Sequence, residues 1–224
     1  MPRTQRKPEE IEAFREKILT HAVELMTQAG YHNFSMRKLA QPLGIAAKTI
    51  YNYYRNKDEL YLAILTKGFE MLHAYCLAAY QSQQDPLKRV DAMIDAYLEF
   101  GLEQVNFYNL MFIWHVPKYN DYVGTAMEPT ALVELETALK NPHLFVKAIQ
   151  ACTGKTDVLA ENDAQLIVIH MWTQLHGFIA GYNNTLLDYM YACPMELKKP
   201  MLDRIKAYLR AELKRYQQTG DRVL

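Results

Sequence analysis

Residues 44–60 read GIAAKTIYNYYRNKDEL, and this stretch combines three tyrosines and two asparagines with three cationic side chains. A buried helix disfavours so many charges, and an ordinary solvated helix rarely carries so many aromatic rings. Gly44 suits a turn, and the composition of residues 47–53 is typical of a short helix. The stretch therefore predicts a short helix that presents hydrogen-bonding groups and positive charge to a partner.

The segments before this stretch predict two further helices. A first helix is expected over residues 8–29, where Pro8 suits the first turn and Gly30 the end. Its apolar stripe consists of Ile11, Phe14, Ile18, Ala22, Leu25 and Ala29. Ser35 is expected to cap a second helix over residues 36–43, with Pro42 inside it. Two short helices joined by a glycine-containing turn are typical of a helix-turn-helix, whose second helix enters the DNA major groove.

The pattern GYHNFSMRKLAQPLGIAAKTIYNYYRNKDELYLAI, residues 30–64, resembles the DNA-binding domain of the tetracycline-repressor (TetR) family. The matching positions are Gly30, Phe34, Ser35, Ala40, Gly44, Ile45, Tyr51, Tyr53, Lys57 and Leu60. Ala46 stands where the family usually has a capping serine, and Tyr54 takes the position of a buried phenylalanine. The resemblance implies a DNA-binding domain over residues 1–55. It also implies a C-terminal helical domain over residues 56–224 for ligand binding and dimerisation.

Seven polar side chains of the N-terminal unit are candidates for DNA contact. They are Arg37, Lys48, Thr49, Tyr51, Asn52, Tyr53 and Lys57. Tyrosine hydroxyl and lysine ammonium groups on phosphate oxygens would set the register on DNA, whereas Lys48, Thr49 or Asn52 can read base edges. Taken singly, each tyrosine also fits a packing role, and Lys57 also fits an ordinary solvated charge. Tyr54 is assigned to the core.

Helical periodicity continues to the end of the chain and strand patterns are nearly absent, so an all-α fold is expected. The structure should consist of a three-helix DNA-binding domain followed by a larger helical bundle. Asn56 resembles the cap of a long helix that ends near residue 81, and Asp85 with Pro86 predicts a helix to residue 104. Two long helices are predicted over residues 161–188 and 195–217.

The middle of the chain is expected to be interrupted. Asn106 can cap an aromatic helix that runs to residue 115. Breaks are predicted at Pro117, Pro129, Pro142 and the turn at Thr153 and Gly154.

By the resemblance, the C-terminal helices should form a dimer interface. Thr173, Gly177 and Gly181 fall four residues apart on one helical face, and small residues there permit close helix packing. Inside a helix each glycine otherwise costs about 1 kcal/mol relative to alanine. The interface candidates are Thr173, Gly177, Ala180, Gly181, Met201, Ile205 and Tyr208. The alternative is that these helices pack only within the chain. Trp172, His176 and Gly177 also resemble the W…HG signature of a C-terminal subclass often called WHG.

The segment NFYNLMFIWHVPKY, residues 106–119, is apolar almost all round, so much of it should be buried or line a cavity. The candidates for a ligand pocket are Phe107, Met111, Phe112, Trp114, His115, Tyr119, Trp172 and His176. Such a lining suits a small apolar or aromatic molecule with one or two hydrogen-bonding groups. The alternative is an ordinary hydrophobic core.

The charges of the chain are unevenly distributed. The formal net charge is zero, but residues 1–60 carry ten Lys and Arg against seven Asp and Glu, a net of +3. Arg3, Arg6 and Lys7 form a basic arm that either reaches DNA or is a disordered tail.

The three cysteines have no CxxC spacing, which argues against a disulfide framework or a zinc site and favours a reducing compartment.

No long apolar run or secretory signal is present, so a cytoplasmic protein is expected. No phosphate-binding loop or catalytic motif is present either, and neither an enzyme activity, a cofactor nor a metal is expected.

Two functions remain open. The first is a transcriptional regulator, expected to be a repressor, that binds a palindromic operator as a homodimer and is released by a small apolar or aromatic ligand. The second is a helical ligand- or partner-binding protein in which the N-terminal three-helix unit is only a packing module.

Overall fold

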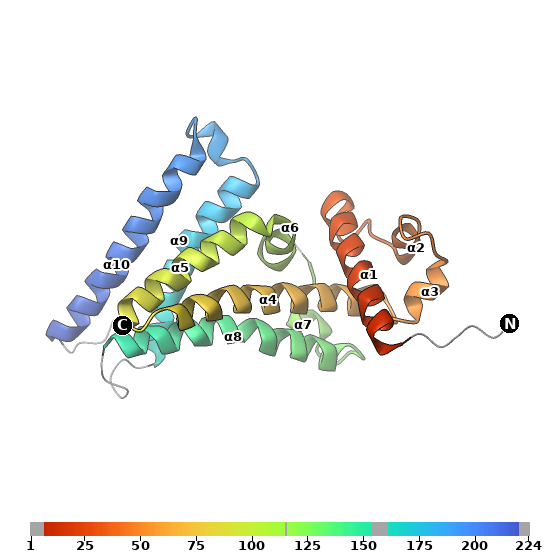
Figure 1. Cartoon of the computed structure of the whole chain (residues 1–224), viewed down its shortest axis with the longest axis horizontal. Coiled ribbons are helices and arrows are strands. Elements are labelled where there is room, and N and C mark those ends of the chain that lie inside the picture. The colour runs from red at the N-terminus through yellow and green to blue at the C-terminus, as the bar shows by residue number, and fades with distance from the viewer. Residues whose placement is uncertain (1–6, 115, 154–160, 220–224) are drawn as a thin grey trace. The chain divides into compact units, whose positions relative to one another are not determined.

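The computed structural model describes residues 7–114, 116–153 and 161–219, and among these it contains helices and no strand (Figure 1). The all-α prediction is therefore confirmed. The α-helices are α1 (Pro8–Ala29), α2 (Met36–Ala40), α3 (Ala47–Tyr51), α4 (Lys57–Ser82), α5 (Pro86–Glu103), α6 (Val105–Tyr108), α7 (Tyr119–Tyr122), α8 (Glu128–Cys152), α9 (Glu161–Asn183) and α10 (Lys198–Thr219). A π-helical turn, η1, covers Asn109–Ile113, and 3₁₀ turns cover Leu187–Tyr189 (η2) and Pro194–Leu197 (η3).

The chain divides into two compact units. The first unit comprises residues 1–68 and 106–136, and the second comprises residues 69–105 and 137–224. The division falls inside α4, α6 and α8, so each of these helices has residues in both units. The proposed division between DNA-binding and ligand-binding regions after residue 55 is a functional one and stays a prediction.

The helix-turn-helix forms largely where the local signals place it. Gly30 ends α1 with φ +78°, a conformation that glycine adopts without strain. The Ser35 hydroxyl accepts a hydrogen bond from the Lys38 backbone N–H at 3.2 Å and so caps α2. The second helix ends at Ala40, so the prediction that it continues to residue 43 was wrong and Pro42 lies beyond it. Pro42 has no backbone N–H to donate to the Lys38 carbonyl, and this carbonyl instead accepts a hydrogen bond from the Gln41 N–H at 3.4 Å, which tightens the turn and ends the helix.

The next two helices differ in how they begin. Ala46 precedes α3 without a side-chain cap, and α3 ends at Tyr51, two residues earlier than predicted. Asn56 precedes α4, and its side-chain oxygen accepts a hydrogen bond from the Glu59 backbone N–H at 2.8 Å, as predicted. The Glu59 carboxylate reaches back to the backbone N–H of Arg55.

The middle of the chain differs from the prediction at Asn106 and at Pro142. Asn106 lies within α6 and does not cap a helix that runs to residue 115. Pro129 is the second residue of α8, where no backbone donor is needed, and Pro142 lies inside the same helix. An internal proline costs about 3 kcal/mol. The helix continues past it because α8 buries Phe145, Val146, Ala148 and Ile149 on the following turns.

The C-terminal helices also end differently. The helix predicted to reach residue 188 ends at Asn183, and Thr185 follows with φ +56° before the 3₁₀ turn η2. The last helix begins at Lys198, three residues later than predicted, because Pro194–Leu197 form a separate 3₁₀ turn.

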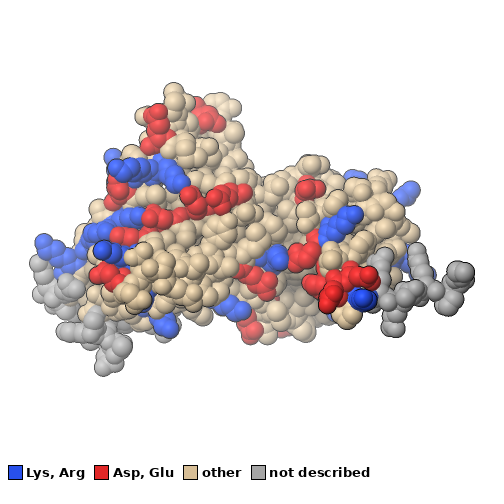
Figure 2. Space-filling model, in the orientation of Figure 1, with Lys and Arg blue, Asp and Glu red and all other residues tan. Residues whose placement is uncertain are grey.

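Each unit has its own hydrophobic core. In the first unit α1 buries Ile18, Leu19, Ala22, Val23 and Met26, a face rotated from the predicted stripe, since Ile11 is exposed. In the second unit α5, α9 and α10 contact one another, and a row of ion pairs joins α10 to α5. These pairs are Lys198–Glu99, Lys206–Asp95 and Arg210–Asp91. Figure 2 shows blue and red side chains lying next to one another over the region of α5 and α10.

Candidate functional site

The short helix α3 exposes a polar face. Lys48, Tyr51 and Asn52 are exposed, whereas Ile50 is fully buried and Tyr54 is 4 % exposed. Ile50 and Tyr54 thus anchor the segment in the first unit and leave two hydrogen-bonding groups and a cation directed outward. Of the large hydrophobic side chains in the helix-turn-helix, Tyr51 stands out because about half of it (49 %) is exposed.

The other four candidates for DNA contact lie in less open surroundings or on a neighbouring helix. Arg37 is exposed on α2, and Thr49 is half-buried on α3. The Tyr53 ring packs against Phe14 with ring centroids 5.3 Å apart. The Lys57 ammonium lies over the Tyr31 ring, 3.8 Å from its centroid. The structure therefore groups the exposed candidates on α2 and α3 and gives Tyr53 and Lys57 partners within the chain.

Lys57 has an unusual environment for a solvent-facing cation. Burial lowers the pKa of its ammonium group, and the neighbouring Asp58 carboxylate opposes that shift. The Asp58 carboxylate also accepts a hydrogen bond from the Tyr31 hydroxyl, and burial raises the pKa of that hydroxyl. Tyr31 additionally contacts Tyr61 edge to face at 4.9 Å. Tyr31 thus ties the turn after α1 to the first two turns of α4.

Two side chains of α1, Phe14 and Arg15, contact Tyr53 and Tyr54 just after α3. These contacts are called the clamp. The Arg15 guanidinium donates a hydrogen bond to the Tyr53 carbonyl oxygen at 3.1 Å, and it lies 5.3 Å from the centroid of the Tyr54 ring. Burial raises the pKa of Tyr54 to about 12, which moves this phenol further from ionisation. Neither Arg15 nor Phe14 was a candidate site residue from the sequence. No local pattern marks contacts between residues 38 positions apart.

The aromatic segment of the first unit is packed as core. Met111 is 2 % exposed, and it lies with Phe107 so close to Gly68 that a Cβ at that position would come within 2.6 Å of the Met111 sulfur. Phe112 packs against Tyr108 with centroids 4.9 Å apart. Close packing of this kind agrees with the hydrophobic-core alternative for residues 107–112.

Three more pocket candidates belong to the same part of the chain. Trp114 is half-buried, and His115 lies outside the described residues. Tyr119 packs against a buried cluster in the first unit, which consists of Leu62, Tyr122, Met127 and Ala131. Neither Trp114 nor Tyr119 lines the cavity described next.

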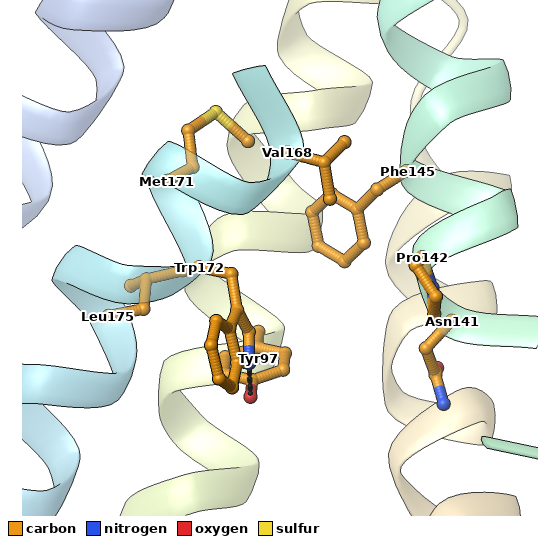
Figure 3. A pocket seen from close by; sticks show the side chains of 8 residues that line it. All are labelled: Tyr97, Asn141, Pro142, Phe145, Val168, Met171, Trp172 and Leu175. Atoms are coloured by element: carbon orange, nitrogen blue, oxygen red, sulfur yellow. Dashed lines mark hydrogen bonds between the residues drawn. The ribbon is translucent and has the colours of Figure 1, made fainter. Parts of the chain in front are cut away.

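A small cavity of about 50 Å³ lies in the second unit between α5, α8 and α9 (Figure 3). Its lining comprises Tyr97, Asn141, Pro142, Phe145, Val168, Met171, Trp172 and Leu175. The Trp172 indole N–H donates a hydrogen bond to the Tyr97 hydroxyl at 2.8 Å. His176 stacks on the Trp172 ring at 4.8 Å, and burial lowers the pKa of its imidazole. Of the described pocket candidates, Trp172 lines this cavity, and His176 contacts Trp172 without being part of the lining.

Most of the cavity lining was missed from the sequence. Tyr97, Phe145 and Met171 carry the periodic apolar pattern of their helices, which marks them as buried but not as neighbours of one another. Pro142 was interpreted as a helix break, although it lies on the cavity wall within α8.

The predicted dimer candidates fall into two groups. Thr173 and Gly177 are exposed on α9, and no atom lies within 4 Å of a Cβ built at Gly177. Ile169, one turn before Thr173, is 56 % exposed on the same face. Ala180 and Met201 are half-buried. Ile169, Thr173 and Gly177 thus form an exposed stripe along α9.

The second group is occupied within the chain. Ile205 is 1 % exposed in the core of the second unit, and Gly181 packs against the Leu187 side chain. Tyr208 stacks on His170 with ring centroids 4.0 Å apart. Ile205 and Gly181 are thus corrected to intrachain packing positions, because Leu187 of η2 covers Gly181 and Ile205 lies on the buried side of α10.

Other kinds of site receive little support from the described part of the chain. Within residues 7–114, 116–153 and 161–219, His, Cys, Asp and Glu side chains form no group of three that is arranged to hold a metal. The three cysteines are free thiols. No helix in these ranges has the length and apolar character needed to cross a bilayer.

Comparison with known proteins adds to this geometry. Residues 18–64 match the family described as bacterial regulatory proteins, tetR family, and residues 90–188 match a family described as tetracyclin repressor-like, C-terminal domain. The chain is 27 % identical to the HTH-type transcriptional activator FasR of Mycolicibacterium smegmatis over 152 residues, which are 68 % of this chain and 61 % of that protein.

A second curated relative and a solved structure extend the comparison. The class D tetracycline repressor protein of Escherichia coli is 34 % identical over 79 residues, 35 % of this chain and 36 % of the repressor. The matches thus span about three fifths and one third of these two relatives. The fatty acid degradation regulator FadR of Bacillus halodurans has a similar fold, with a TM-score of 0.66 at 16 % identity over 92 % of this chain and 99 % of that one.

Proposed function

This chain belongs to the TetR family of bacterial regulatory proteins, and we propose that it is a transcriptional regulator that binds a two-fold symmetric DNA operator. The observation that carries the proposal is the outward face of α3, where Lys48, Tyr51 and Asn52 are exposed while Ile50 is buried. A helix of this kind places its exposed side chains at base edges and its flanks at phosphates. It acts in the cytoplasm, where DNA is accessible.

The candidate residues have separate roles in this proposal. Lys48 and Asn52 read bases in the major groove, where amide and ammonium groups distinguish purine edges. Tyr51 and Arg37 contact phosphate oxygens and set the register, together with Thr49 and Tyr53. Lys57 supplies a further phosphate contact only if its ammonium group leaves the Tyr31 ring, because the two lie 3.8 Å apart in the free protein.

The regulator binds its operator as a homodimer. The exposed stripe of Ile169, Thr173 and Gly177 on α9 supports this, because an apolar and small-residue face permits a second helix to approach closely. A two-fold symmetric protein requires two half-sites separated by one turn of DNA, about 34–36 Å, or a multiple of it. Of the predicted interface, Thr173, Gly177, Ala180 and Met201 stay in this proposal.

A small apolar ligand releases the regulator from DNA, which makes it a repressor. The cavity between α5, α8 and α9 supports an apolar occupant, since its lining is aromatic and aliphatic. At about 50 Å³ it is much smaller than the roughly 300–1,000 Å³ of typical ligand pockets, so a ligand must enlarge it. Such a ligand binds the enlarged form more tightly than the form drawn in Figure 3, and this difference shifts the population away from DNA.

The test is selection of bound duplexes from a random DNA pool by the purified protein at two salt concentrations. Recovery of a salt-sensitive, two-fold symmetric sequence supports the proposal and gives the half-site spacing. Binding without any sequence preference, or no binding at either salt, contradicts it and favours a helical protein that binds another partner. Once the operator sequence is known, reporter expression from a promoter that contains it distinguishes repression from activation.

A further inference from the structure

We propose that Arg15, on α1, is a positioning residue for α3 and that it controls how well the protein discriminates its operator from other DNA. The inference rests on the proposed DNA binding. It concerns a side chain outside the helix-turn-helix segment proper, whose contribution is made through the backbone that follows α3.

The helix α3 depends on contacts from outside itself. It has five residues, far fewer than the roughly 12–15 that an isolated helix needs to be even marginally stable. Its preceding residue is Ala46, which makes no side-chain hydrogen bond to the first turn. The start of the helix is therefore held by backbone hydrogen bonds, such as that from the Thr49 N–H to the Ala46 carbonyl at 2.8 Å, and by the packing of the buried Ile50.

The end of α3 is held from α1 by two consecutive side chains. Arg15 donates to the Tyr53 carbonyl at 3.1 Å and covers the Tyr54 ring at 5.3 Å. Phe14 packs against the Tyr53 ring at 5.3 Å. Two residues of α1 thus restrain Tyr53 and Tyr54, the second and third residues after α3, by a hydrogen bond, a cation–π contact and ring packing. Because the base-reading candidate Asn52 directly precedes Tyr53, movement at this clamp moves Asn52.

The restraint matters more for specific binding than for nonspecific binding. Reading a base edge requires hydrogen-bond geometry, whereas nonspecific binding relies on charge attraction to phosphates, which tolerates small displacements. Loss of the clamp should therefore weaken operator binding and leave binding to random DNA nearly unchanged. An Arg15 that contacts phosphate directly would behave differently. Its loss would weaken both complexes equally and reduce the dependence of affinity on salt by about one unit of slope.

The experiment compares full-length wild type with Arg15→Gln and Phe14→Leu, and it uses Lys17→Gln as the matched control. Lys17 is exposed on the same helix, so its substitution removes one positive charge from α1 without disturbing the clamp. Affinity is measured for the selected operator and for a random duplex of equal length at four salt concentrations. Circular dichroism and thermal unfolding are recorded for each protein.

For Arg15→Gln the operator affinity should fall about tenfold, the loss expected when one base contact is misplaced. Affinity for the random duplex should stay within about twofold, and the salt slope should match that of Lys17→Gln. Phe14→Leu should shift the operator-to-random ratio in the same direction without any change of charge. If Arg15→Gln is not folded at the assay temperature, the ratio of operator affinity to random-duplex affinity in Phe14→Leu tests the inference instead.

Equal losses on both duplexes, or an unchanged ratio in both clamp variants, would overturn the inference and leave the proposed function intact. Absence of sequence preference in the wild type would overturn both. The two failures are therefore distinguishable within a single set of titrations.

Discussion

The indole N–H of Trp172 donates to the hydroxyl of Tyr97 at 2.8 Å and so joins α9 to α5 at the wall of the cavity. Trp172 is 37 % exposed, so the same ring borders both the cavity and the surface of the second unit. His176 stacks on this ring and completes a small aromatic group. An occupant that enlarges the cavity must displace this wall or the opposite one, which Asn141, Pro142 and Phe145 of α8 form.

Tyr97→Phe should therefore loosen Trp172. Loss of the hydrogen bond should lower the free energy of unfolding by about 1 kcal/mol. The chain has two tryptophans, so the Trp114→Phe background leaves Trp172 as the sole indole reporter. In that background Tyr97→Phe should increase acrylamide quenching of the indole fluorescence. Tyr189→Phe is the control, because this phenol is 87 % exposed and should change neither quantity; equal quenching in both variants would contradict the role of the bond.

Substitutions on α3 should separate base reading from phosphate contact. Lys48→Ala and Asn52→Ala should each relax preference at particular base positions, by about 1–3 kcal/mol where the lost contact is bidentate. Tyr51→Phe should instead weaken binding by a similar factor on operator and random DNA, because it removes a phosphate contact. Titrations of operator duplexes with single base changes measure the difference. Uniform losses for Lys48→Ala and Asn52→Ala would remove these residues from base reading.

Gly177→Arg should produce a folded monomer. No atom lies within 4 Å of a Cβ at this position, so the chain itself has room for a side chain, whereas a closely packed second α9 would not. Sedimentation velocity should show wild type as a dimer and the variant as a monomer with an unchanged helical spectrum. Gln81→Arg, at an exposed position near the end of α4, adds the same charge and should stay dimeric. A dimeric Gly177→Arg protein would place the interface elsewhere.

Glu134 should make stability depend on pH. It is 7 % exposed in the first unit, and burial raises the pKa of its carboxyl from 4.5 to about 7, although Lys118 opposes the shift. Between these two values the folded protein holds a proton that the unfolded chain has lost. The free energy of unfolding should therefore fall as pH rises from about 4.5 to about 7, and level off above that range.

Glu134→Gln tests this dependence. The variant should be more stable than wild type at pH 8, by on the order of 2 kcal/mol, and its stability should vary less between pH 5 and pH 8. Urea unfolding at these two pH values measures both effects. Glu136→Gln, at an exposed position on the same helix, should behave like wild type. The assignment fails if the two glutamine variants respond to pH alike.

Local signals in the sequence were enough to predict most of the helices. Ser35, Asn56 and Asp85 cap the helices they were expected to cap, because an N-cap depends on a side chain and backbone two or three residues away. Pro142 was wrongly interpreted as a break, since a proline signal is local whereas the packing that carries α8 through it is not. The π-helical turn at Asn109–Ile113 was missed for the same reason. Its carbonyl groups at Leu110 and Met111 accept hydrogen bonds from the distant side chains of Tyr61 and Lys118.

The candidate sites also differ in whether local sequence signals or tertiary packing determine them. The outward polar face of α3 follows from the order of residues in a short helix, so its exposed side chains are predictable from residues 44–60 alone. The cavity is not, because its walls come from α5, α8 and α9, and their neighbours are set by tertiary packing. Ile205 and Gly181 have the composition of an interface, yet the chain itself covers both.

The sequence alone determined the all-α class, the helix-turn-helix and the polar face of its second helix, since periodicity, caps and turns act over a few residues. Only the tertiary structure decided which apolar faces meet, which small residues remain open, and that Arg15 reaches Tyr53 across 38 positions. Burial energy depends on apolar area, not on the identity of the partner surface, so many pairings of amphipathic helices satisfy the same pattern. The choice among them is made by shape and close packing.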